Sequence, residues 1–227
     1  DTARSRGLGD VYKRQVTDQS STTAAIVKKS LTATTSSSNK TYNGDATATT
    51  TLSFSGLVGS ETLGQSVSST FNNKNVGTGK TVTVNSITLS DGSNGGVASN
   101  YSISSGQTTT ANITAKALTV SGITASNKTY DGNTVVTLDL TGTSYSGLIS
   151  GDDVSISASG SFDNKNVGTG KTVNISSSYS GSDVGNYSIT DQATTTANIT
   201  ASVSGITVRG ITASNKTYDG NNSATLD

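Results

Sequence analysis

The chain of 227 residues contains no cysteine, histidine, methionine, tryptophan or proline. Without cysteine there is no disulfide framework, so each folded unit must be stabilised by its own core. Without histidine and cysteine the usual pairs of catalytic base and nucleophile cannot be built, and no pair of carboxylates stands out in their place. We therefore expect no enzyme activity, no catalytic residues and no cofactor.

Net charge and long apolar runs are missing as well. The 15 basic and 15 acidic residues cancel, which argues against nucleic acid or an anionic membrane as a partner. No apolar run approaches the ~20 residues that span a bilayer. We expect neither nucleic acid binding nor membrane contact. The absence of cysteine fits many bacterial surface proteins and disfavours a small eukaryotic secreted domain.

Serine, threonine, asparagine and glycine make up most of what is present, with apolar residues at regular positions between them. Val136, Leu138 and Leu140 alternate with polar residues, and Val154, Ile156 and Ala158 do the same. A period of two residues is typical of a strand with one buried face. The pattern predicts six or seven short strands in an all-β fold, an antiparallel β-sandwich of the immunoglobulin-like (Ig-like) type.

One stretch of six residues organises the chain. Asn127–Gly132, read as NKTYDG, recurs identically as Asn215–Gly220 and as Asn39–Gly44 with Asn43 in place of the aspartate, 88 residues apart each time. A second motif, F-N/D-NKNVGTGKTV, begins at Phe71 and again at Phe162. A period of this length suits a small domain better than a solenoid coil. The chain is therefore predicted to be a tandem array of one module.

The motif order divides the chain into four parts. We expect a disordered leader at residues 1–30, one repeat at residues 31–115, a second at residues 116–201 and a truncated third at residues 202–227, which lacks the strands to close a core. Residues 1–15 resemble translated read-through of a sequencing adapter and are excluded from the fold. The short links at Ala115–Ala117 and Ala201–Gly205 predict closely coupled modules.

The repeated motif is predicted to be structural. Its Asn-Gly or Asp-Gly step supplies the positive φ of a tight turn. The tyrosine before it is expected to pack its ring under the end of its own module, with the hydroxyl on a backbone group or water. The residues assigned structural roles are Asn39, Tyr42, Gly44, Asn127, Tyr130, Asp131, Gly132, Asn215, Tyr218, Asp219 and Gly220, with Phe71 and Phe162.

Three weaker patterns have simpler explanations. Gly170-Lys171-Thr172 is similar to the end of a phosphate-binding loop, but an alternating strand follows instead of a helix, so a turn is expected. The acidic pair Asp152–Asp153 lacks a third ligand and reads as a solvated loop, so no metal site is predicted. Lys128, Lys165 and Lys171 are candidates for a lysine–asparagine cross-link, although solvated lysines are the more frequent case.

Three motifs in order, NKTYDG, GDDVSISASGSFDNKNVGTGKTV and GNYSI followed by TTTANITA, resemble the YDG repeat. The resemblance covers residues 31–227. That repeat occurs in tandem in large bacterial cell-surface proteins, including adhesins similar to filamentous haemagglutinin. The resemblance implies an extracellular location on the bacterial surface and a stalk or adhesive role. Asn43 departs from the motif, as do Ala115 and Ala201, where the family usually has proline.

Two functions are compatible with these patterns. The repeats form a spacer that projects a distal binding domain, with neighbouring repeats as their partners. Alternatively, they bind a host glycan or protein themselves, weakly and multivalently. Sugar sites usually present aromatic side chains, and only 5% of the residues are aromatic. Tyr145 and Tyr179 are expected to be the most exposed, and neither has a counterpart in the first copy, which favours the spacer.

Overall fold

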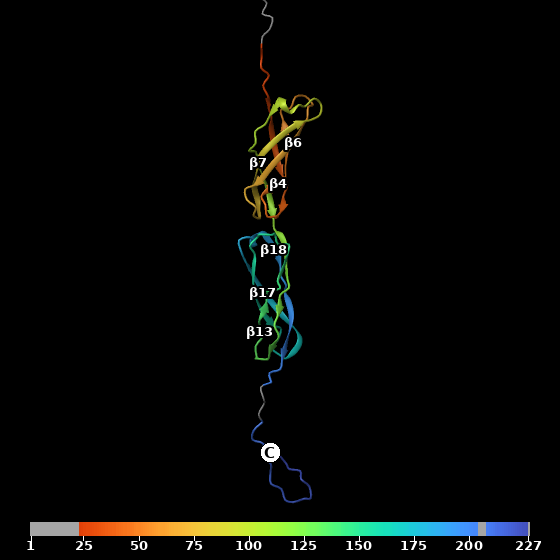
Figure 1. The fold of residues 1–227 in the computed structure, drawn as a ribbon, viewed down its shortest axis with the longest axis vertical. Helices are drawn as coiled ribbons and strands as arrows, with labels where there is room; N and C mark the ends of the chain where they lie inside the picture. Colours follow the sequence, from red (N-terminus) through yellow and green to blue (C-terminus); the bar gives the residue numbers. More distant parts are fainter. Residues whose placement is uncertain (1–22, 204–207, 227) are drawn as a thin grey trace, which may run out of the picture.

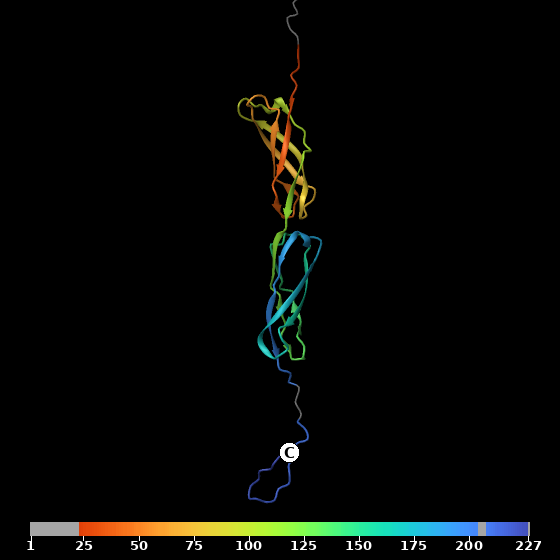
Figure 2. The same cartoon turned by 180° about the vertical axis from the view of Figure 1, so that it is seen from behind.

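The computed structural model describes residues 23–203 and 208–226. Two β-rich modules lie one after the other along a single long axis, as Figures 1 and 2 show from opposite sides. The helices among the described residues are two single turns of 3₁₀ helix, η1 (Ala98–Asn100) and η2 (Val184–Asn186). The predicted all-β fold in tandem copies is confirmed.

The first module consists of nine strands and η1. The strands are β1 (Lys29–Ser30), β2 (Thr32–Ser37), β3 (Lys40–Thr41), β4 (Thr47–Ala48), β5 (Thr50–Ser55), β6 (Leu63–Phe71), β7 (Gly77–Asp91), β8 (Tyr101–Ser102) and β9 (Thr108–Thr114).

The second module consists of ten strands and η2. The strands are β10 (Lys116–Ser121), β11 (Thr124–Ala125), β12 (Lys128–Thr129), β13 (Val135–Val136), β14 (Leu138–Asp139), β15 (Ser144–Ser146), β16 (Ser155–Phe162), β17 (Gly168–Ser180), β18 (Tyr187–Thr190) and β19 (Thr194–Thr200).

Each module is built around a five-stranded sheet with the same topology. The strand order is β3-β9-β7-β6-β4 in the first module and β12-β19-β17-β16-β13 in the second. The sheets are mixed, because β3 runs parallel to β9 and β12 runs parallel to β19, while the remaining pairs in these sheets are antiparallel. The expectation of purely antiparallel sheets is therefore wrong. The reason is that the start of each module lies beside its last strand and runs in the same direction.

The opening segment of the second module changes partner along its length. β10 pairs antiparallel with β15 and parallel with β18, β11 pairs with β14, and β12 pairs with β19. Between β10 and β11, Gly122 has φ +86°, a backbone conformation that favours glycine. This change of partner divides the opening segment into three short strands, so the module has more strands than the six or seven predicted.

The core of each module follows the period of two seen in the sequence. Phe71 and Phe162 are both buried at the ends of β6 and β16, where each pairs with a valine of the neighbouring strand. Ile113 and Ile199 are buried at equivalent positions of the last strands. Because the alternate residues of these strands are mainly serine and threonine, each sheet has one apolar and one polar face.

The two ends of the described chain behave differently from each other. Lys29 and Ser30, assigned above to a disordered leader, form β1, because they pair in parallel with Tyr101 and Ser102. Residues 1–15 lie outside the described residues. After the second module, every described residue from 201 to 226 is exposed, and the only pairing described there is the isolated bridge between Ala213 and Leu226.

Candidate functional site

The two modules meet at a packed interface. Ala115 is the one residue between β9 of the first module and β10 of the second. Apolar side chains from both modules join in a single cluster at this place, with Tyr42, Phe71 and Ile113 from the first module and Leu118, Leu148, Ile149 and Tyr187 from the second. The link is therefore a buried contact between domains and not an open linker.

The motif tyrosine reaches this interface because its segment is attached to the last strand. The amide N–H of Tyr42 donates to the carbonyl oxygen of Thr114 at 2.8 Å, and the side-chain oxygen of Asn39 accepts from the amide of Asn112 at 2.7 Å. The second module repeats both contacts, from Tyr130 to Thr200 and from Asn198 to Asn127, at 2.8 and 2.7 Å. Each motif tyrosine thus lies where the chain leaves its module.

The turn after the tyrosine is held by an ion pair and by glycine. Lys128 lies 2.7 Å from Asp131, and Lys216 lies 2.7 Å from Asp219. Gly44, Gly132 and Gly220 have φ values of +87°, +84° and +77°. Asn215 is exposed, like the rest of the described part of the third copy.

Asn43, the first copy's departure from the motif, is compensated two residues later. The second copy reads Asp131-Gly-Asn133 and the first reads Asn43-Gly-Asp45, so the acid and the amide have exchanged places. Lys40 pairs with Asp45 at 2.8 Å, and the side-chain amide of Asn43 donates to Oδ2 of Asp45 at 2.9 Å. The same lysine–carboxylate–amide arrangement therefore closes both turns.

Tyr42 and Tyr187 converge on one carboxylate across the interface. The hydroxyl of Tyr42 donates to Oδ2 of Asp152 at 2.8 Å, and that of Tyr187 donates to the same oxygen at 2.6 Å. The two rings pack edge to face, with centroids 5.6 Å apart and planes at 79°. Asp152 therefore joins a tyrosine of the first module to one of the second.

Lys74 adds a charge to the same place. Its Nζ lies 3.3 Å from Oδ1 of Asp152 and 3.0 Å from Oδ1 of Asp183, and 5.8 Å from the centre of the Tyr42 ring. Two residues further, the amide of Val76 donates to Oδ1 of the buried Asn186 at 3.0 Å. The interface is thus apolar at its centre, and the polar groups around the centre are paired by hydrogen bonds and ion pairs.

The ionisation of these groups follows from their contacts. The side chain of Asp152 is 4% exposed. Burial alone raises its pKa, but the hydrogen bonds from Tyr187, Tyr42 and Lys74 outweigh burial and hold the pKa below its usual value. Burial and the bond to Asp152 raise the pKa of Tyr187 to about 12 and raise that of Tyr42 as well. Bonds to Asp183, Tyr42 and Asp152 raise the pKa of Lys74. At neutral pH the carboxylate is charged and both phenols are protonated.

The three motif tyrosines differ in exposure despite their shared sequence. Tyr42 is 1% exposed, Tyr130 is 38% exposed and Tyr218 is 91% exposed. The prediction that the motif ring packs within its own module is therefore wrong for Tyr130, because the ring that is buried, that of Tyr42, packs against the following module. Asp152 also departs from its predicted solvated loop, since its side chain is buried in the interface.

Sequence reasoning missed the other partners of Tyr42. Tyr187 lies in the repeated NYSI segment and Lys74 in the repeated NKNVG segment, so both recur in the sequence as positions with counterparts in the other copy. Recurrence alone does not show which repeated residues face each other across a junction.

The remaining patterns have structural explanations. Gly170 has φ +59° and lies within β17, in an irregularity of the pairing with β19. Gly170-Lys171-Thr172 therefore belongs to a strand and not to a phosphate loop, and the expected turn is wrong. Lys128 and Lys171 are ion-paired to Asp131 and Asp163. Within residues 23–203 and 208–226 no three acidic side chains gather as a metal site would require. The same residues include no helix long and apolar enough to cross a bilayer.

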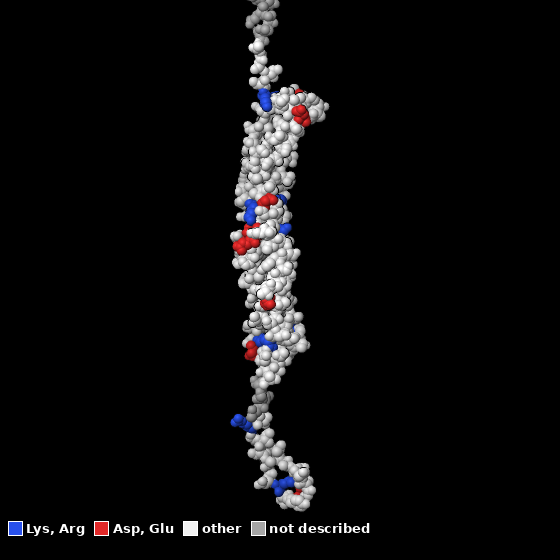
Figure 3. Space-filling view, viewed as in Figure 1, with Lys and Arg blue, Asp and Glu red and all other residues white. Residues whose placement is uncertain are grey.

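Exposed apolar side chains lie at the ends of the pair of modules. Within the two modules, the large hydrophobic residues that are exposed are Val58 and Val97 at the first module's outer end, and Tyr130, Val135 and Val167 at the second module's outer end. Most of the charged side chains visible in Figure 3 also gather at the junction and at the two ends. Tyr145 and Tyr179, expected to be the most exposed aromatics, are half-buried, and Tyr145 packs against the interface cluster.

A comparison with protein families finds one match. The model described as YDG domain matches residues 27–111 and again residues 114–197. No curated protein matches the chain, and no solved structure does.

Proposed function

Because the chain belongs to the YDG domain family, with two adjacent copies of the domain, we propose that it is a spacer segment of a large bacterial surface adhesin. In this role the repeats stand outside the cell and project a binding domain away from it. Each repeat has its neighbours in the same chain as its partners.

The interface between the modules carries this proposal. A spacer must resist bending at every junction, since a flexible chain of modules would collapse towards the surface. The contact of Tyr42 and Lys74 with Asp152 combines a buried aromatic pair with a charged hydrogen-bond network. With one residue, Ala115, between β9 and β10, the chain has little freedom to rotate there.

One side of the second module supports the same role. One side hollow, over β16 and β17, is lined by Ala158 and by serines from residues 157–159 and 176–178. A surface of small polar side chains offers few aromatic contacts to a sugar and few apolar contacts to a protein. The large exposed apolar groups lie at the ends instead, where neighbouring repeats meet.

We further propose that each module is a β-sandwich of the Ig-like type. In such a fold two sheets pack face to face, and an opening segment can contribute to both. β10 and β11 pair within the smaller sheets and β12 pairs with the five-stranded sheet, which fits a segment that crosses from one layer to the other.

The second candidate function is weak multivalent binding of a host glycan or protein by the repeats. Tyr130, at 38%, is the most exposed aromatic residue of the two modules. It occupies the position that Tyr42 uses for the contact between modules, which favours a repeat as its partner over a host ligand.

The spacer is tested by displaying arrays of increasing length between a surface anchor and a terminal epitope. The height of the epitope above the cell, measured by super-resolution imaging, should rise in proportion to the number of modules. An array with Tyr42→Ala and Asp152→Ala should give a lower and broader height. A height independent of module number would contradict the spacer, and binding of the purified chain to host glycoproteins that is lost in Tyr130→Ala would favour the second candidate.

A further inference from the structure

The outer end of the first module repeats the receiving half of the interface. Tyr101 occupies the position of Tyr187, and its hydroxyl donates to a carboxylate oxygen of Glu61. The amide of Val58 donates to the Tyr101 hydroxyl at 3.1 Å, as the amide of Ile149 donates to Tyr187 at 3.0 Å. Glu61 therefore stands where the second module has Asp152.

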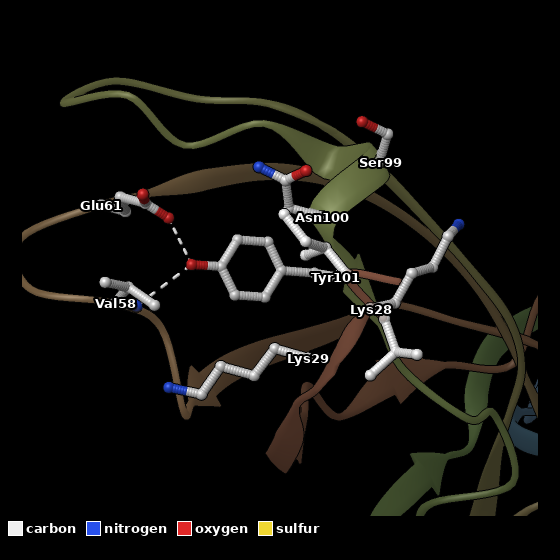
Figure 4. A pocket seen from close by; sticks show the side chains of 9 residues that line it. Lys28, Lys29, Val58, Glu61, Ser99, Asn100 and Tyr101 are labelled. Carbon is white, nitrogen blue, oxygen red and sulfur yellow. Dashed lines mark hydrogen bonds between the residues drawn. The ribbon is translucent and has the colours of Figure 1, made fainter. Parts of the chain in front are cut away.

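This end is open. Val58, Glu61, Asn100 and Tyr101, with residues 26–29, line a cavity of about 350 Å³. We call these four residues the end pocket. Figure 4 shows Glu61 and Val58 on either side of the Tyr101 hydroxyl, and Asn100 above the ring. Asn100 is exposed, whereas its counterpart Asn186 is buried and accepts a hydrogen bond from the first module.

The sequence before the end pocket belongs to the repeat. Residues 16–27 read VTDQSSTTAAIV, and residues 189–200, at the end of the second module, read ITDQATTTANIT. Ile26 falls at the position of Ile113 and Ile199, both about 1% exposed, yet Ile26 is fully exposed. Ile26 thus occupies a core position of the repeat, although its side chain is exposed here.

The spacing from this segment into the first module equals the spacing from the first module into the second. Leu31 follows Val27 by four residues, and Leu118 follows Thr114 by four residues. β1 pairs Lys29 with Tyr101, as β10 pairs Lys116 with Tyr187. A module ending at Val27 would therefore present its motif tyrosine to Tyr101 as the first module presents Tyr42 to Tyr187.

We propose that the end pocket is the binding site for the tyrosine turn of a preceding copy of this module in the same chain. The incoming phenol donates to the Glu61 carboxylate beside the hydroxyl of Tyr101. The incoming lysine of the NKNVG segment pairs with Glu61, and the amide two residues after that lysine donates to Oδ1 of Asn100. Val97 stands where the second module has Asp183, so the lysine has one carboxylate partner here instead of two.

This proposal concerns one surface and is separable from the spacer role. The spacer depends on the junction between Tyr42 and Asp152, which the chain already contains. The end pocket concerns a junction to a further copy, and the two junctions can be measured side by side.

The test extends the chain by one module. Residues 1–27 are replaced by a copy of residues 116–200, so that its last residue precedes Lys28 with the natural spacing. Hydrogen exchange is then measured over residues 57–62 and 97–101. We expect exchange there to slow by about tenfold or more relative to the unextended chain, a usual strength of coupling between sites. Tyr130→Phe in the added copy, or Glu61→Gln, should remove most of this gain.

Controls keep the outcome unambiguous. Slow hydrogen exchange in β17 of the added copy shows that this copy has folded. If the added copy has not folded, the experiment is repeated with a second extended chain, in which a copy of residues 28–114 takes its place. Unchanged exchange at the end pocket beside a folded added module would overturn the proposal, as would a gain that survives both substitutions. Hydrogen exchange at the Tyr42–Asp152 junction, measured in the same samples, tests independently whether the junction on which the spacer depends is formed.

Discussion

The hydroxyl of Tyr42 donates a hydrogen bond of 2.8 Å to Oδ2 of Asp152, a residue 110 positions later in the chain. Tyr42 belongs to the first module and Asp152 to the second, so this contact exists only when the two modules are docked. Because Asp152 is nearly inaccessible to solvent, loss of the bond is not readily replaced by water. A substitution that removes only the hydroxyl can therefore measure how much this bond stabilises the junction.

Removal of the Tyr42 hydroxyl should weaken the junction. Tyr42→Phe deletes one hydrogen bond to an ionised, buried carboxylate, which typically contributes about 2 kcal/mol. We expect the free energy of unfolding of the chain in urea to fall by about that amount. Tyr42→Ala, which also removes the ring, should lower it by about 3 kcal/mol or more.

Tyr130→Phe is the matched control, because Tyr130 has the same motif position and the residues described beyond it form no folded module. We expect a change within about 0.5 kcal/mol. Equal losses for Tyr42→Phe and Tyr130→Phe would show that the hydroxyl acts within its own module. A double-mutant cycle of Tyr42→Phe with Asp152→Asn should give a coupling of about 1 kcal/mol or more.

The junction should be weakened at both extremes of pH. The folded pKa of Asp152 lies below that of an unfolded aspartate, about 3.9, so its contribution is present above pH ~4 and is lost as pH falls through the lower folded value. The folded pKa of Tyr187 is raised to about 12 from a usual value near 10, so its contribution is complete below pH ~10 and is lost as pH rises towards 12.

Urea unfolding across pH 2–12 measures this dependence, which should be flat between roughly pH 5 and 9. Asp152→Asn is the control for the acid limb. Asp45, Asp131 and Asp163 also have lowered pKa values, so part of the acid loss should remain in the variant. An acid limb identical in wild type and Asp152→Asn would contradict the assigned role of Asp152.

Substitutions at Gly44 and Gly132 distinguish the cost of backbone strain from the cost of disturbed packing between the modules. Both have strongly positive φ, so alanine should cost about 1–2 kcal/mol at either position. A Cβ on Gly44 would also lie 3.1 Å from Cγ2 of Ile149 in the second module, whereas a Cβ on Gly132 would have no atom within 4 Å. We therefore expect Gly44→Ala to be the more destabilising in urea unfolding, and equal losses would argue against tight packing at the junction.

Residues 116–201 alone should fold without metal. Val136, Phe162, Val173, Ala197 and Ile199 form a core cluster within the second module. Far-UV circular dichroism should show a β spectrum and a cooperative melt, at a lower midpoint than in the whole chain because Tyr187 and Leu148 lose their cover. A spectrum without β structure, or one that depends on added calcium, would contradict this.

Local pattern accounts for much of the fold. The period of two in Val136, Leu138 and the strand ending at Phe162 predicts strands with one buried face, and Phe162 is buried. Asp131-Gly132 predicts a turn with positive φ at the glycine, as the structure has it. Such features depend on neighbours within a few residues, so a single sequence carries them.

The pairing of strands was only partly predictable. β12 lies parallel to β19, and Lys128 pairs with Ile199, 71 residues away. Polar and apolar alternation is the same for a strand that pairs in parallel and for one that pairs antiparallel. The choice is made by the packing of the opening segment against both sheets, which involves the whole module.

The sequence by itself determined the repeat, the β-rich fold, the core strands and the turns of this protein. Only the tertiary structure decided what the motif tyrosine does. Tyr42, Tyr130 and Tyr218 follow the same three residues, yet one is buried, one is partly exposed and one is almost fully exposed. The difference arises because the burial of each ring depends on whether a folded module follows, and on a carboxylate such as Asp152 that the next module supplies from far along the chain.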